Sequence, residues 1–261
     1  MTEGVTAILL LIGGGSLLAA LACRYYFPFR LPKPANRLRV FMYHATDERD
    51  GLWGIPKRLN MTPSRLEAQL RYLVRRGSTF LFASEVGTCE TQRPVCLTFD
   101  DGYLSNHKVL FPLLKRYQAK ATIFLSRQTV FPQAPLLGEA EIREMLQSGL
   151  VEFGAHTISH AHLPELPDKQ AEAEILQSKH RVENLTGKPC TTFAYPFGQF
   201  TSRDIDILKR NGFVRAFTCE RGIPDANTLA RDPYRIPRIY VNGNILPFEF
   251  HLLCTRAKFK L

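Results

Sequence analysis

The sequence predicts an α/β protein in which parallel strands close into a barrel. Short runs rich in β-branched and aromatic residues alternate six or seven times with segments of helical periodicity, which is typical of a parallel sheet covered by helices. An open doubly wound sheet would carry a glycine-rich phosphate loop after an early strand, and the sequence has none. Polar residues follow several strands, as they do where active sites lie in barrels. A (β/α) barrel of seven or eight strands is therefore preferred.

The first element in chain order is an uncharged apolar segment at residues 5–23. At the rise of an α-helix its length is roughly 28 Å, close to the hydrocarbon thickness of a bilayer. Glu3 is the only charged residue before it, whereas a cleaved signal peptide requires a positive n-region. Residues 1–23 are therefore predicted to be an uncleaved transmembrane anchor rather than a lipoprotein signal ending at Cys23.

Charge predicts the orientation of this anchor. Basic residues follow the apolar segment and none precedes it: Arg24, Arg30, Lys33, Arg37 and Arg39. By the positive-inside rule, the body is expected on the cytoplasmic side of a bacterial-type inner membrane, and the extracytoplasmic side stays open as the alternative. The odd number of cysteines beyond the anchor, without CxxC spacing, agrees with a reducing compartment. The net charge of +10 has no accompanying nucleic-acid motif, so the membrane surface and not nucleic acid is the expected anionic partner.

The remaining chain divides into a linker, a barrel and a tail. Three prolines among basic and aromatic residues mark residues 24–36 as a juxtamembrane linker. The barrel is expected over residues 37–245 and a basic amphipathic helix over residues 246–261. Strands are predicted at residues 37–44, 79–82, 94–99, 121–125, 151–155, 191–195, 213–219 and 236–241. Helices are predicted at residues 62–77, 104–117, 139–148, 168–186 and 202–211; the first begins with Thr62 as N-cap and Pro63 at N1.

The third predicted strand ends in two adjacent carboxylates, Asp100 and Asp101, followed by Gly102. Neighbouring side chains on a strand point to opposite faces, so the two aspartates have different surroundings. One can bind a metal while the other acts as a base. Alternatively, the pair only forms a turn and caps the next helix.

Other polar clusters follow other strands. His44 ends the first strand, His156 and His160 follow the strand at 151–155, and Tyr195-Pro196-Phe197 follow the strand at 191–195. His156 and His160 are expected on one face of a helical turn. With one carboxylate they make a facial metal-binding set typical of zinc, although non-haem iron oxygenases use the same ligands. The remaining histidines are predicted to be solvated: His107, His162, His180 and His251.

Three segments carry a family resemblance. Residues 97–103 read LTFDDGY, residues 156–163 read HTISHAHL and residues 193–198 read FAYPFG. In this order and spacing they resemble the polysaccharide deacetylases of carbohydrate esterase family 4, over roughly residues 40–241. The resemblance implies a distorted (β/α) barrel of the polysaccharide-deacetylase type. It also implies a divalent metal, expected to be Zn²⁺, and removal of N-acetyl groups from amino sugars.

Carried over by position, the resemblance implies that Asp101, His156 and His160 bind the metal and that Asp100 is the general base. The metal lowers the pKa of a water, and Asp100 takes the proton of that water as it attacks the acetamide. The backbone N–H of Phe197, after Pro196, would hold the oxyanion together with the metal.

Two departures from the common family pattern matter. Ala194 stands where an arginine that orients the base is usual, and a late histidine that protonates the leaving amine is missing. Both resemble the circularly permuted poly-N-acetylglucosamine deacetylase branch, in which an early MYH segment supplies the acid. His44 is therefore the predicted general acid. Arg238, or with less support Arg235, is the predicted replacement for the missing arginine.

The leading hypothesis is a membrane-anchored, metal-dependent N-deacetylase that acts on an N-acetylated glycan, either a cell-surface polysaccharide or its lipid-linked precursor. Two alternatives stay open. A deformylase or other amidohydrolase of a lipid-linked amino sugar would use the same site, and a catalytically silent glycan-binding protein would share the fold. The complete set of Asp100, Asp101, His156 and His160 favours an enzyme, because a silent binder has no physical need of it.

Overall fold

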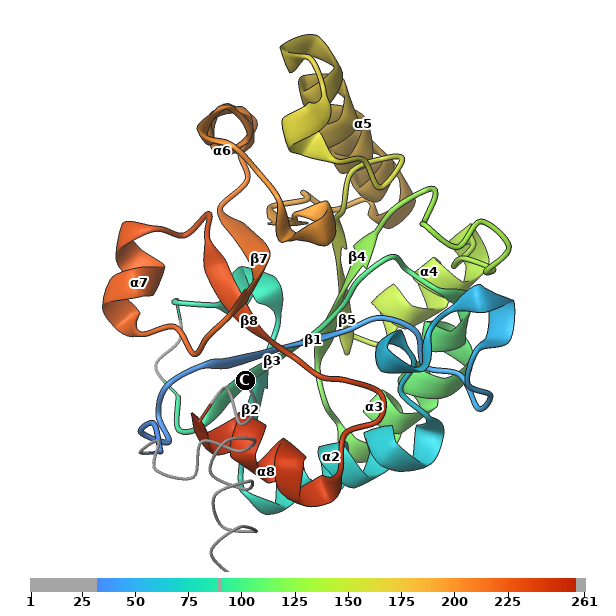
Figure 1. Ribbon diagram of the computed structural model, residues 1–261, viewed down its shortest axis with the longest axis vertical. Helices are drawn as coiled ribbons and strands as arrows, with labels where there is room; N and C mark the ends of the chain where they lie inside the picture. Colours follow the sequence, from blue (N-terminus) through green and yellow to red (C-terminus); the bar gives the residue numbers. More distant parts are fainter. Residues whose placement is uncertain (1–31, 89–90, 257–261) are drawn as a thin grey trace, which may run out of the picture.

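The computed structural model describes residues 32–88 and 91–256. Its strands form a parallel sheet that curls into a barrel, with helices packed around the outside (Figure 1). The strands are β1 (Arg39–Tyr43), β2 (Thr79–Leu81), β3 (Pro94–Phe99), β4 (Ala121–Leu125), β5 (Val151–Ala155), β6 (Thr192–Ala194), β7 (Arg215–Arg221) and β8 (Ile236–Tyr240). The α-helices are α2 (Pro63–Arg75), α3 (Phe111–Tyr117), α4 (Glu139–Gln147), α5 (Asp168–Thr186), α6 (Ser202–Arg210), α7 (Ala226–Arg231) and α8 (Pro247–Arg256).

The barrel is closed by β3, which pairs with three strands. One edge pairs with β1 along its length, from Arg39↔Val95 to Tyr43↔Phe99. The other edge pairs with β2 at its start and with β4 at its end, where Thr98 is opposite Thr122. Seven strands thus form a ring in the order β1-β8-β7-β6-β5-β4-β3, and β2 attaches beside it. The predicted barrel is confirmed as a seven-stranded one.

The ring is irregular on one side. β5 and β6 share a single aligned pair, Ala155↔Phe193, and the register of β7 against β8 shifts between Phe217 and Arg221. Fewer residues are aligned at these two pairings than at the β1–β3 and β4–β5 pairings. The barrel is therefore distorted where β5 to β8 meet.

Alternating strand residues supply two separate apolar clusters. Phe41, Leu97 and Ile123 belong to a large cluster that also contains helix residues, so it lies between the strands and the surrounding helices. Val40 and Phe124 belong to a smaller cluster made mainly of strand residues, with Leu229 of α7 packed against it, and this cluster fills the barrel interior. Because successive side chains on a strand face opposite ways, a single run of apolar residues serves both clusters.

The helix signals in the sequence correspond to observed ends. Pro63 is the first residue of α2, whose Leu66, Leu70 and Leu73 recur at helical spacing and are buried. α5 ends at Gly187, which takes the left-handed conformation with φ of 66°. The predicted helix at residues 104–117 differs, because Asn106–Leu110 is π-helical before α3 begins. The short helix α7 was not predicted.

Both ends of the described chain lie against the barrel. The N–H of Lys33 donates to the carbonyl of Thr255 (2.8 Å), and the Arg39 guanidinium donates to the Pro34 carbonyl (2.8 Å). Phe250 of α8 packs on Phe41, with ring centroids 5.3 Å apart. The first part of the predicted linker and the last residues of the predicted tail fall outside the described residues, so the boundaries of these segments stay predictions.

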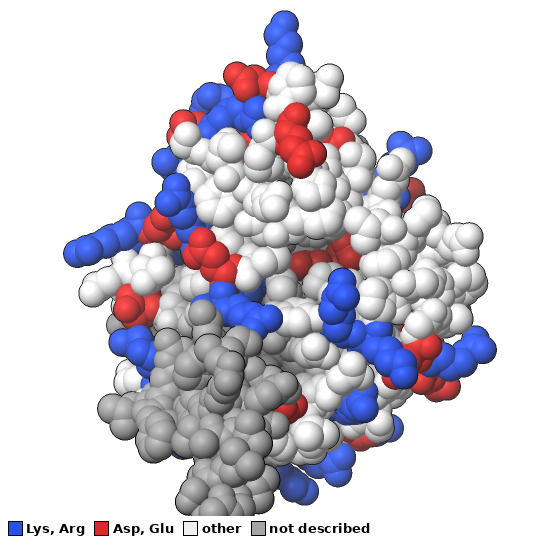
Figure 2. All heavy atoms as spheres, in the orientation of Figure 1, with Lys and Arg blue, Asp and Glu red and all other residues white. Residues whose placement is uncertain are grey.

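The predicted anchor at residues 5–23 also falls outside the described residues. Among the helices of residues 32–88 and 91–256, none is long and apolar enough to cross a membrane. On the face shown in Figure 2, basic side chains lie singly or in small groups both at the margin and near the centre, and acidic side chains lie among them.

Candidate active site

The carboxyl ends of four strands carry the predicted site residues. His44 directly follows β1, Asp100 and Asp101 follow β3, His156 follows β5, and Tyr195 follows β6. Because the barrel strands are parallel, these ends lie at one rim. The four polar clusters singled out in the sequence therefore share one end of the barrel.

The two aspartates diverge because the backbone turns between them. The N–H of Asp100 donates to the Tyr43 carbonyl (3.0 Å) and so continues the strand ladder. Asp101 and Gly102 take left-handed conformations, with φ of 74° and 75°, which is uncommon for an aspartate. A Cβ on Gly102 would lie 2.7 Å from Leu125 Cδ2, so the turn requires glycine. The left-handed turn, rather than simple alternation along a strand, separates the carboxylates.

Asp101, His156 and His160 form a compact cluster. The Oδ1 atom of Asp101 lies 3.3 Å from His160 Nε2 and 3.6 Å from His156 Nε2. One ligand atom from each residue falls within 4.8 Å of the others. Asp101 and His156 are buried and His160 is partly buried.

The chemistry of this cluster fits a divalent cation. The Nδ1–H of His156 donates to the Ala194 carbonyl (2.7 Å), which leaves the lone pair of Nε2 directed at the cluster. Burial lowers the pKa of His156 to about 3 and also lowers the pKa of His160, so both imidazoles are neutral near pH 7. Asp101 Oδ1 is buried and has no hydrogen-bond partner among the described residues. The acceptors Asp101 Oδ1 and His156 Nε2 thus converge beside the ring of His160, a set of groups suited to a divalent metal.

Burial raises the pKa of Asp101 to about 6. Asp100 adds to this rise, whereas the charge of the nearby His44 opposes it. A bound cation would favour the ionised carboxylate and reverse the rise, because a metal is the largest local charge in such a site. His44 Nδ1 is buried and also lacks a hydrogen-bond partner within the described part of the chain. His44 therefore lies near the cluster, and its Nδ1 makes no hydrogen bond to the described residues.

The segment that joins His156 to His160 is not the expected helical turn. Thr157 and His160 have left-handed φ values of 56° each, and these residues lie in a loop. The i, i+4 spacing still brings the imidazoles together, with ring centroids 5.0 Å apart. Their convergence depends on contacts that hold the loop rather than on helical geometry.

Glu174 of α5 supplies the main contacts to this loop. Its Oε2 accepts hydrogen bonds from the N–H groups of Ile158 and Ser159, each 2.9 Å long, and its Oε1 accepts one from Ser159 Oγ (2.6 Å). From the other side, the Arg127 N–H donates to the Ile158 carbonyl (2.9 Å). Sequence reasoning missed Glu174, because a polar residue on an amphipathic helix is ordinarily assigned to solvent.

Asp100 is held by Arg238. Arg238 Nη1 donates to Asp100 Oδ1 (2.7 Å) and Nη2 donates to Oδ2 (2.8 Å). Its remaining donors reach the Thr218 carbonyl (2.9 Å) and Thr98 Oγ1 (3.1 Å). Burial by itself would raise the pKa of Asp100, but the charge and hydrogen bonds of Arg238, together with the nearby His156 and His44, outweigh burial and hold that pKa well below its ordinary value. The alternative residue, Arg235, instead pairs with Asp232 (3.5 Å).

The turn after β6 presents an amide beside the cluster. In the turn Pro196–Gly198, the N–H groups of Gly198 and Gln199 donate to the carbonyls of Tyr195 and Pro196, so the turn itself does not use the Phe197 N–H. Phe197 has φ of 58°, and its ring meets the His160 ring edge-on at 4.6 Å. Tyr195 is buried and its hydroxyl donates to the Tyr234 carbonyl (3.1 Å).

Two further residues complete the surroundings of this turn. His162, which the sequence predicted to be merely solvated, stacks on Phe197 with ring centroids 3.7 Å apart and an interplanar angle of 9°. Gly198 lies directly against β7, where a Cβ would be 2.5 Å from Cys219 Cβ. His162 thus covers the outer face of the turn, and Gly198 allows the turn to approach the barrel.

Comparison with known proteins gives concordant matches. A sequence model of the polysaccharide deacetylase family matches residues 87–216. A Bacillus subtilis protein named "Putative polysaccharide deacetylase YxkH" is 30% identical over 216 residues, which cover 80% of this chain and 73% of that protein. The poly-beta-1,6-N-acetyl-D-glucosamine N-deacetylase of Staphylococcus epidermidis is 29% identical over 207 residues, covering 72% of this chain and 70% of the enzyme.

Solved structures agree with these matches. The Streptococcus pyogenes deacetylase PplD, in complex with acetate, superposes with a TM-score of 0.74 at 25% identity and covers 86% of this chain and 99% of its own. A polysaccharide deacetylase from Bacillus cereus gives a TM-score of 0.75 at 28% identity, over 84% of this chain and 69% of its own. The overall fold is therefore shared with these proteins.

Proposed function

The chain belongs to the polysaccharide deacetylase family, and on this premise we propose that it removes N-acetyl groups from the amino sugars of a cell-surface polysaccharide or of its lipid-linked precursor. The observation that carries this proposal is the division of labour between adjacent aspartates. Asp101 faces two neutral imidazoles, whereas Asp100 is bound at both oxygens by Arg238. The carboxylate of Asp101 can thus bind a cation, and the carboxylate of Asp100 can accept a proton.

We assign Asp101, His156 and His160 as the ligands of a divalent metal, with zinc as the proposed ion because nitrogen and carboxylate ligands suit it. A cation bound there polarises the acetamide carbonyl and lowers the pKa of the attacking water. The ring orientation of His156 is set beforehand by its bond to the Ala194 carbonyl. Glu174 sets the position of His160 through the loop between the two histidines.

The remaining groups handle protons and developing charge. Asp100 is ionised at neutral pH because Arg238 lowers its pKa, and it accepts the proton of the water that adds to the acetamide carbon. The Phe197 N–H donates to the oxyanion that forms. His44 donates a proton to the amino-sugar nitrogen as the C–N bond breaks. The products are acetate and a free amine.

The direct test is acetate release by the purified, zinc-loaded full chain. We expect oligomers of N-acetylglucosamine to yield acetate and free amine in equal amounts. A chelator should abolish the reaction, and added zinc should restore it. Release of formate from N-formyl sugars without acetate release would replace deacetylation by deformylation. Glycan binding without hydrolysis of any N-acyl sugar would refute an enzymatic role.

We also propose that residues 5–23 anchor the chain in a membrane and that the barrel lies on the cytoplasmic side. The support comes from the uncharged segment and from the basic residues that follow it. In this arrangement a lipid-linked sugar at the inner leaflet would be the accessible substrate. Alkaline phosphatase fused to the C-terminus should be inactive in bacterial cells, and an active fusion would overturn the orientation.

A further inference from the structure

An open groove lies on the outside of the barrel between α2 and α8, which are side by side in Figure 1. Its volume is about 420 Å³, within the range of pockets that hold small ligands. We call it the α2–α8 groove and define it by six of its lining residues: Arg65, Ala68, Tyr72, Ile245, Leu246 and Phe250. None of these residues has a part in the proposed reaction.

The lining of the groove is mostly apolar. Ile245 and Phe250 are buried and belong to the large cluster between the strands and the helices, so they form the floor. Ala68 is exposed on α2, and Leu246, just before α8, is 50% exposed although its side chain is large and apolar. Apolar surface is thus open to solvent on the side of each helix. An elongated strip of this kind favours a hydrocarbon ligand, because every CH₂ group that leaves water contributes to binding.

The groove starts at the rim that carries the active site. α2 is the α-helix after β1 and α8 is the one after β8, so both run from this rim toward the opposite end of the barrel. Gln69 also lines the groove and accepts a hydrogen bond from the Tyr43 hydroxyl (2.8 Å). Tyr43 directly precedes the proposed acid His44. The groove is therefore backed by the strand that ends at His44.

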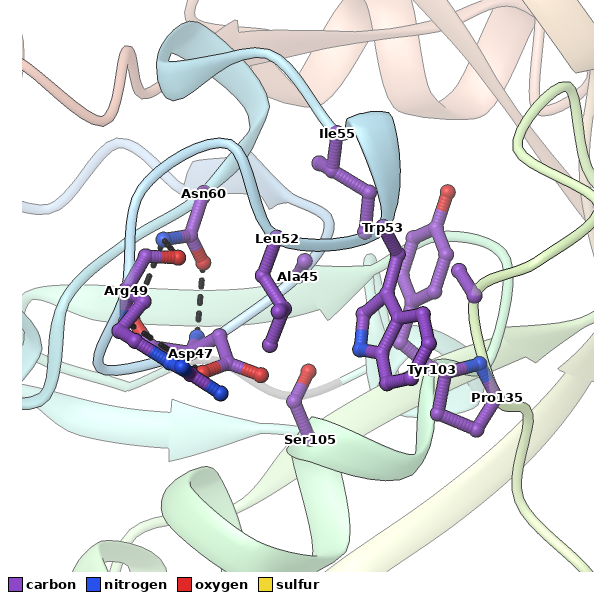
Figure 3. Close-up of a pocket in the computed structure, with 11 residues that line it drawn as sticks. Ala45, Asp47, Arg49, Leu52, Trp53, Ile55, Asn60, Tyr103, Ser105 and Pro135 are labelled. Atoms are coloured by element: carbon purple, nitrogen blue, oxygen red, sulfur yellow. Dashed lines mark hydrogen bonds between the residues drawn. The ribbon is translucent and has the colours of Figure 1, made fainter.

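The loop at the rim end of the groove is held firmly. The Asn60 side chain accepts a hydrogen bond from the Asp47 N–H (2.7 Å) and donates one to the Asp47 carbonyl (3.1 Å), in the region drawn in Figure 3. Gly243 packs on the same loop, where a Cβ would collide with the Asn60 carbonyl. The hollow shown in Figure 3 has a free volume of only about 20 Å³, so it suits a water molecule rather than a substrate. The α2–α8 groove is the larger space.

Two arginines meet at Gly243 near the rim end. The Arg65 guanidinium donates to the Gly243 carbonyl (2.7 Å), and the Arg58 carbonyl accepts from the Gly243 N–H (3.0 Å). Arg65 is the one charged residue among the described residues of the lining, and Arg58 is exposed. Guanidinium groups match the geometry of phosphate oxygens. The rim end of the groove therefore suits an anion, whereas the remainder suits an apolar chain.

The other end of the groove leads toward the start of the described chain. α8 has ten residues and is about 15 Å long at the rise of an α-helix. Near its end the Thr255 carbonyl accepts from the Lys33 N–H (2.8 Å). Residues 24–31 separate this point from the proposed anchor at residues 5–23, and eight residues span at most roughly 27 Å. With the anchor in a membrane, the groove connects the membrane side of the barrel with the active-site rim.

We propose that the α2–α8 groove binds the hydrocarbon chain of a lipid-linked amino sugar, with Arg65 at the phosphate that joins the chain to the sugar. The sugar then lies over the rim at the metal, and the chain lies along α2 and α8 toward the membrane. The inference rests on the proposed function and selects the lipid-linked precursor over the finished polysaccharide as the substrate. Arg65 and Ala68 then determine specificity, although they are remote from the bond that is cleaved.

Two substrates test this inference on the zinc-loaded full chain in phosphatidylcholine nanodiscs, where no detergent competes for the groove. One is N-acetylglucosamine joined through a diphosphate to a farnesyl chain, and the other is the water-soluble N-acetylglucosamine tetramer. Ala68→Trp fills the groove and should raise KM for the farnesyl substrate about tenfold, because each CH₂ that loses its contact weakens binding several-fold. KM and kcat for the tetramer should not change, which also shows that the variant is folded.

Arg65→Gln tests the phosphate contact. It should raise KM for the farnesyl substrate about tenfold, the usual loss for one charge-assisted contact, and should leave the kinetics of the tetramer unchanged. Arg71→Gln, at an exposed position of α2, and Ala140→Trp, at an exposed position of α4, are the matched controls. Neither residue lines the groove, so neither variant should change KM for either substrate.

A photoreactive farnesyl phosphate gives a readout without turnover. A diazirine on its hydrocarbon chain should label residues 64–72 or 245–250 of the chelator-treated full chain, and excess unlabelled farnesyl phosphate should prevent the labelling. Equal labelling of these residues by a diazirine-bearing phosphatidylcholine would assign the groove to the bilayer. A dimer in sedimentation that Ala68→Trp dissociates would assign it to a second copy of the chain. Either result would overturn the proposal.

The outcomes separate this inference from the proposed function. An unchanged KM for the farnesyl substrate in both variants, with the tetramer still deacetylated, would overturn the lipid site and leave the deacetylase intact. Equal losses on both substrates would show a general defect and would also overturn the lipid site. Specific farnesyl labelling without acetate release from either substrate would overturn the proposed function while the lipid site stands. Absence of both labelling and reaction would overturn both.

Discussion

Arg238 and Asp100 form a bidentate ion pair in which both carboxylate oxygens accept from the guanidinium, at 2.7 and 2.8 Å. The two residues are 138 positions apart in the chain and both are buried. The pair keeps Asp100 ionised and fixes the plane of its carboxylate. A bidentate arrangement limits rotation in a way that a single ammonium group does not.

Replacing Arg238 should therefore change the pKa and the orientation of the Asp100 carboxylate. Arg238→Lys retains the charge but loses the planar two-point contact, so the pKa of Asp100 should rise and the acid limb of kcat/KM should move to higher pH. Arg238→Met should also lower the free energy of unfolding by about 3–5 kcal/mol, because it leaves a buried carboxylate unpaired. The measurements are pH–rate profiles at saturating zinc and urea unfolding. An unchanged acid limb in Arg238→Lys would contradict the role of Arg238.

His44 is expected to act on the leaving group and not on the metal. His44→Ala should lower kcat by about 10²–10⁴-fold, the usual contribution of general acid catalysis, and should leave zinc affinity unchanged. Zinc titration and acetate release on the same preparation separate these effects. His180→Ala, an exposed substitution on α5, is the control. Full activity of His44→Ala would refute its assignment as the acid.

Glu174 should matter for metal affinity although it does not touch the metal. Glu174→Gln removes an acceptor from the loop between the two ligand histidines, so the dissociation constant for zinc should rise about 10–100-fold. Competition with a chelating indicator measures this constant independently of activity. Glu172→Gln on the same helix is the matched control, because Glu172 pairs with Arg210 instead. Equal affinities in the two variants would mean that Glu174 does not position the loop.

The turn that presents the Phe197 N–H should be sensitive to one added carbon. Gly198→Ala places a Cβ against Cys219 and pushes the turn away from β7. If the Phe197 N–H stabilises the oxyanion, kcat should fall about 10²–10³-fold, with a smaller change in KM. Gly187→Ala adds the same left-handed strain at a position with no neighbour within 4 Å. A normal kcat in Gly198→Ala would exclude this amide from the reaction.

Glu152 links stability to pH away from the active site. Burial raises its pKa above the ordinary value of 4.5, although hydrogen bonds from Ser84 and Thr192 partly oppose the rise. The folded chain then binds this proton more tightly than the unfolded chain, so the contribution to stability is present below pH 4.5 and is lost as pH rises through the raised pKa.

Glu152→Gln cannot titrate and should lose this dependence. The free energy of unfolding of Glu152→Gln minus that of wild type should therefore be larger at pH 8 than at pH 5, meaning that the variant gains stability relative to wild type as pH rises. Urea unfolding at the two pH values measures the difference, and Glu48→Gln, at an exposed position, should show none. A constant difference between wild type and Glu152→Gln across this range would contradict the raised pKa.

Much of the site could be predicted from local pattern because parallel strands bring their carboxyl ends together. Asp100, Asp101 and His156 follow apolar runs, and His160 comes four residues after His156; the barrel then places them at one rim. The helical turn expected at His156 was wrong, since left-handed residues interrupt it. Spacing alone does not reveal backbone conformation, because a loop and a helix can separate two imidazoles by the same distance.

By itself, the sequence determined the alternation of strands and helices, the chain positions of the chemical groups and the apolar segment at residues 5–23, because each depends on neighbours within a few residues. Only the tertiary structure decided which distant groups meet. Arg238 reaches Asp100 because β8 pairs with β1, and β1 in turn pairs with β3, which closes the ring. Glu174 reaches the metal-binding loop because α5 packs on β5. Such contacts depend on strand register and helix packing, which no local pattern encodes.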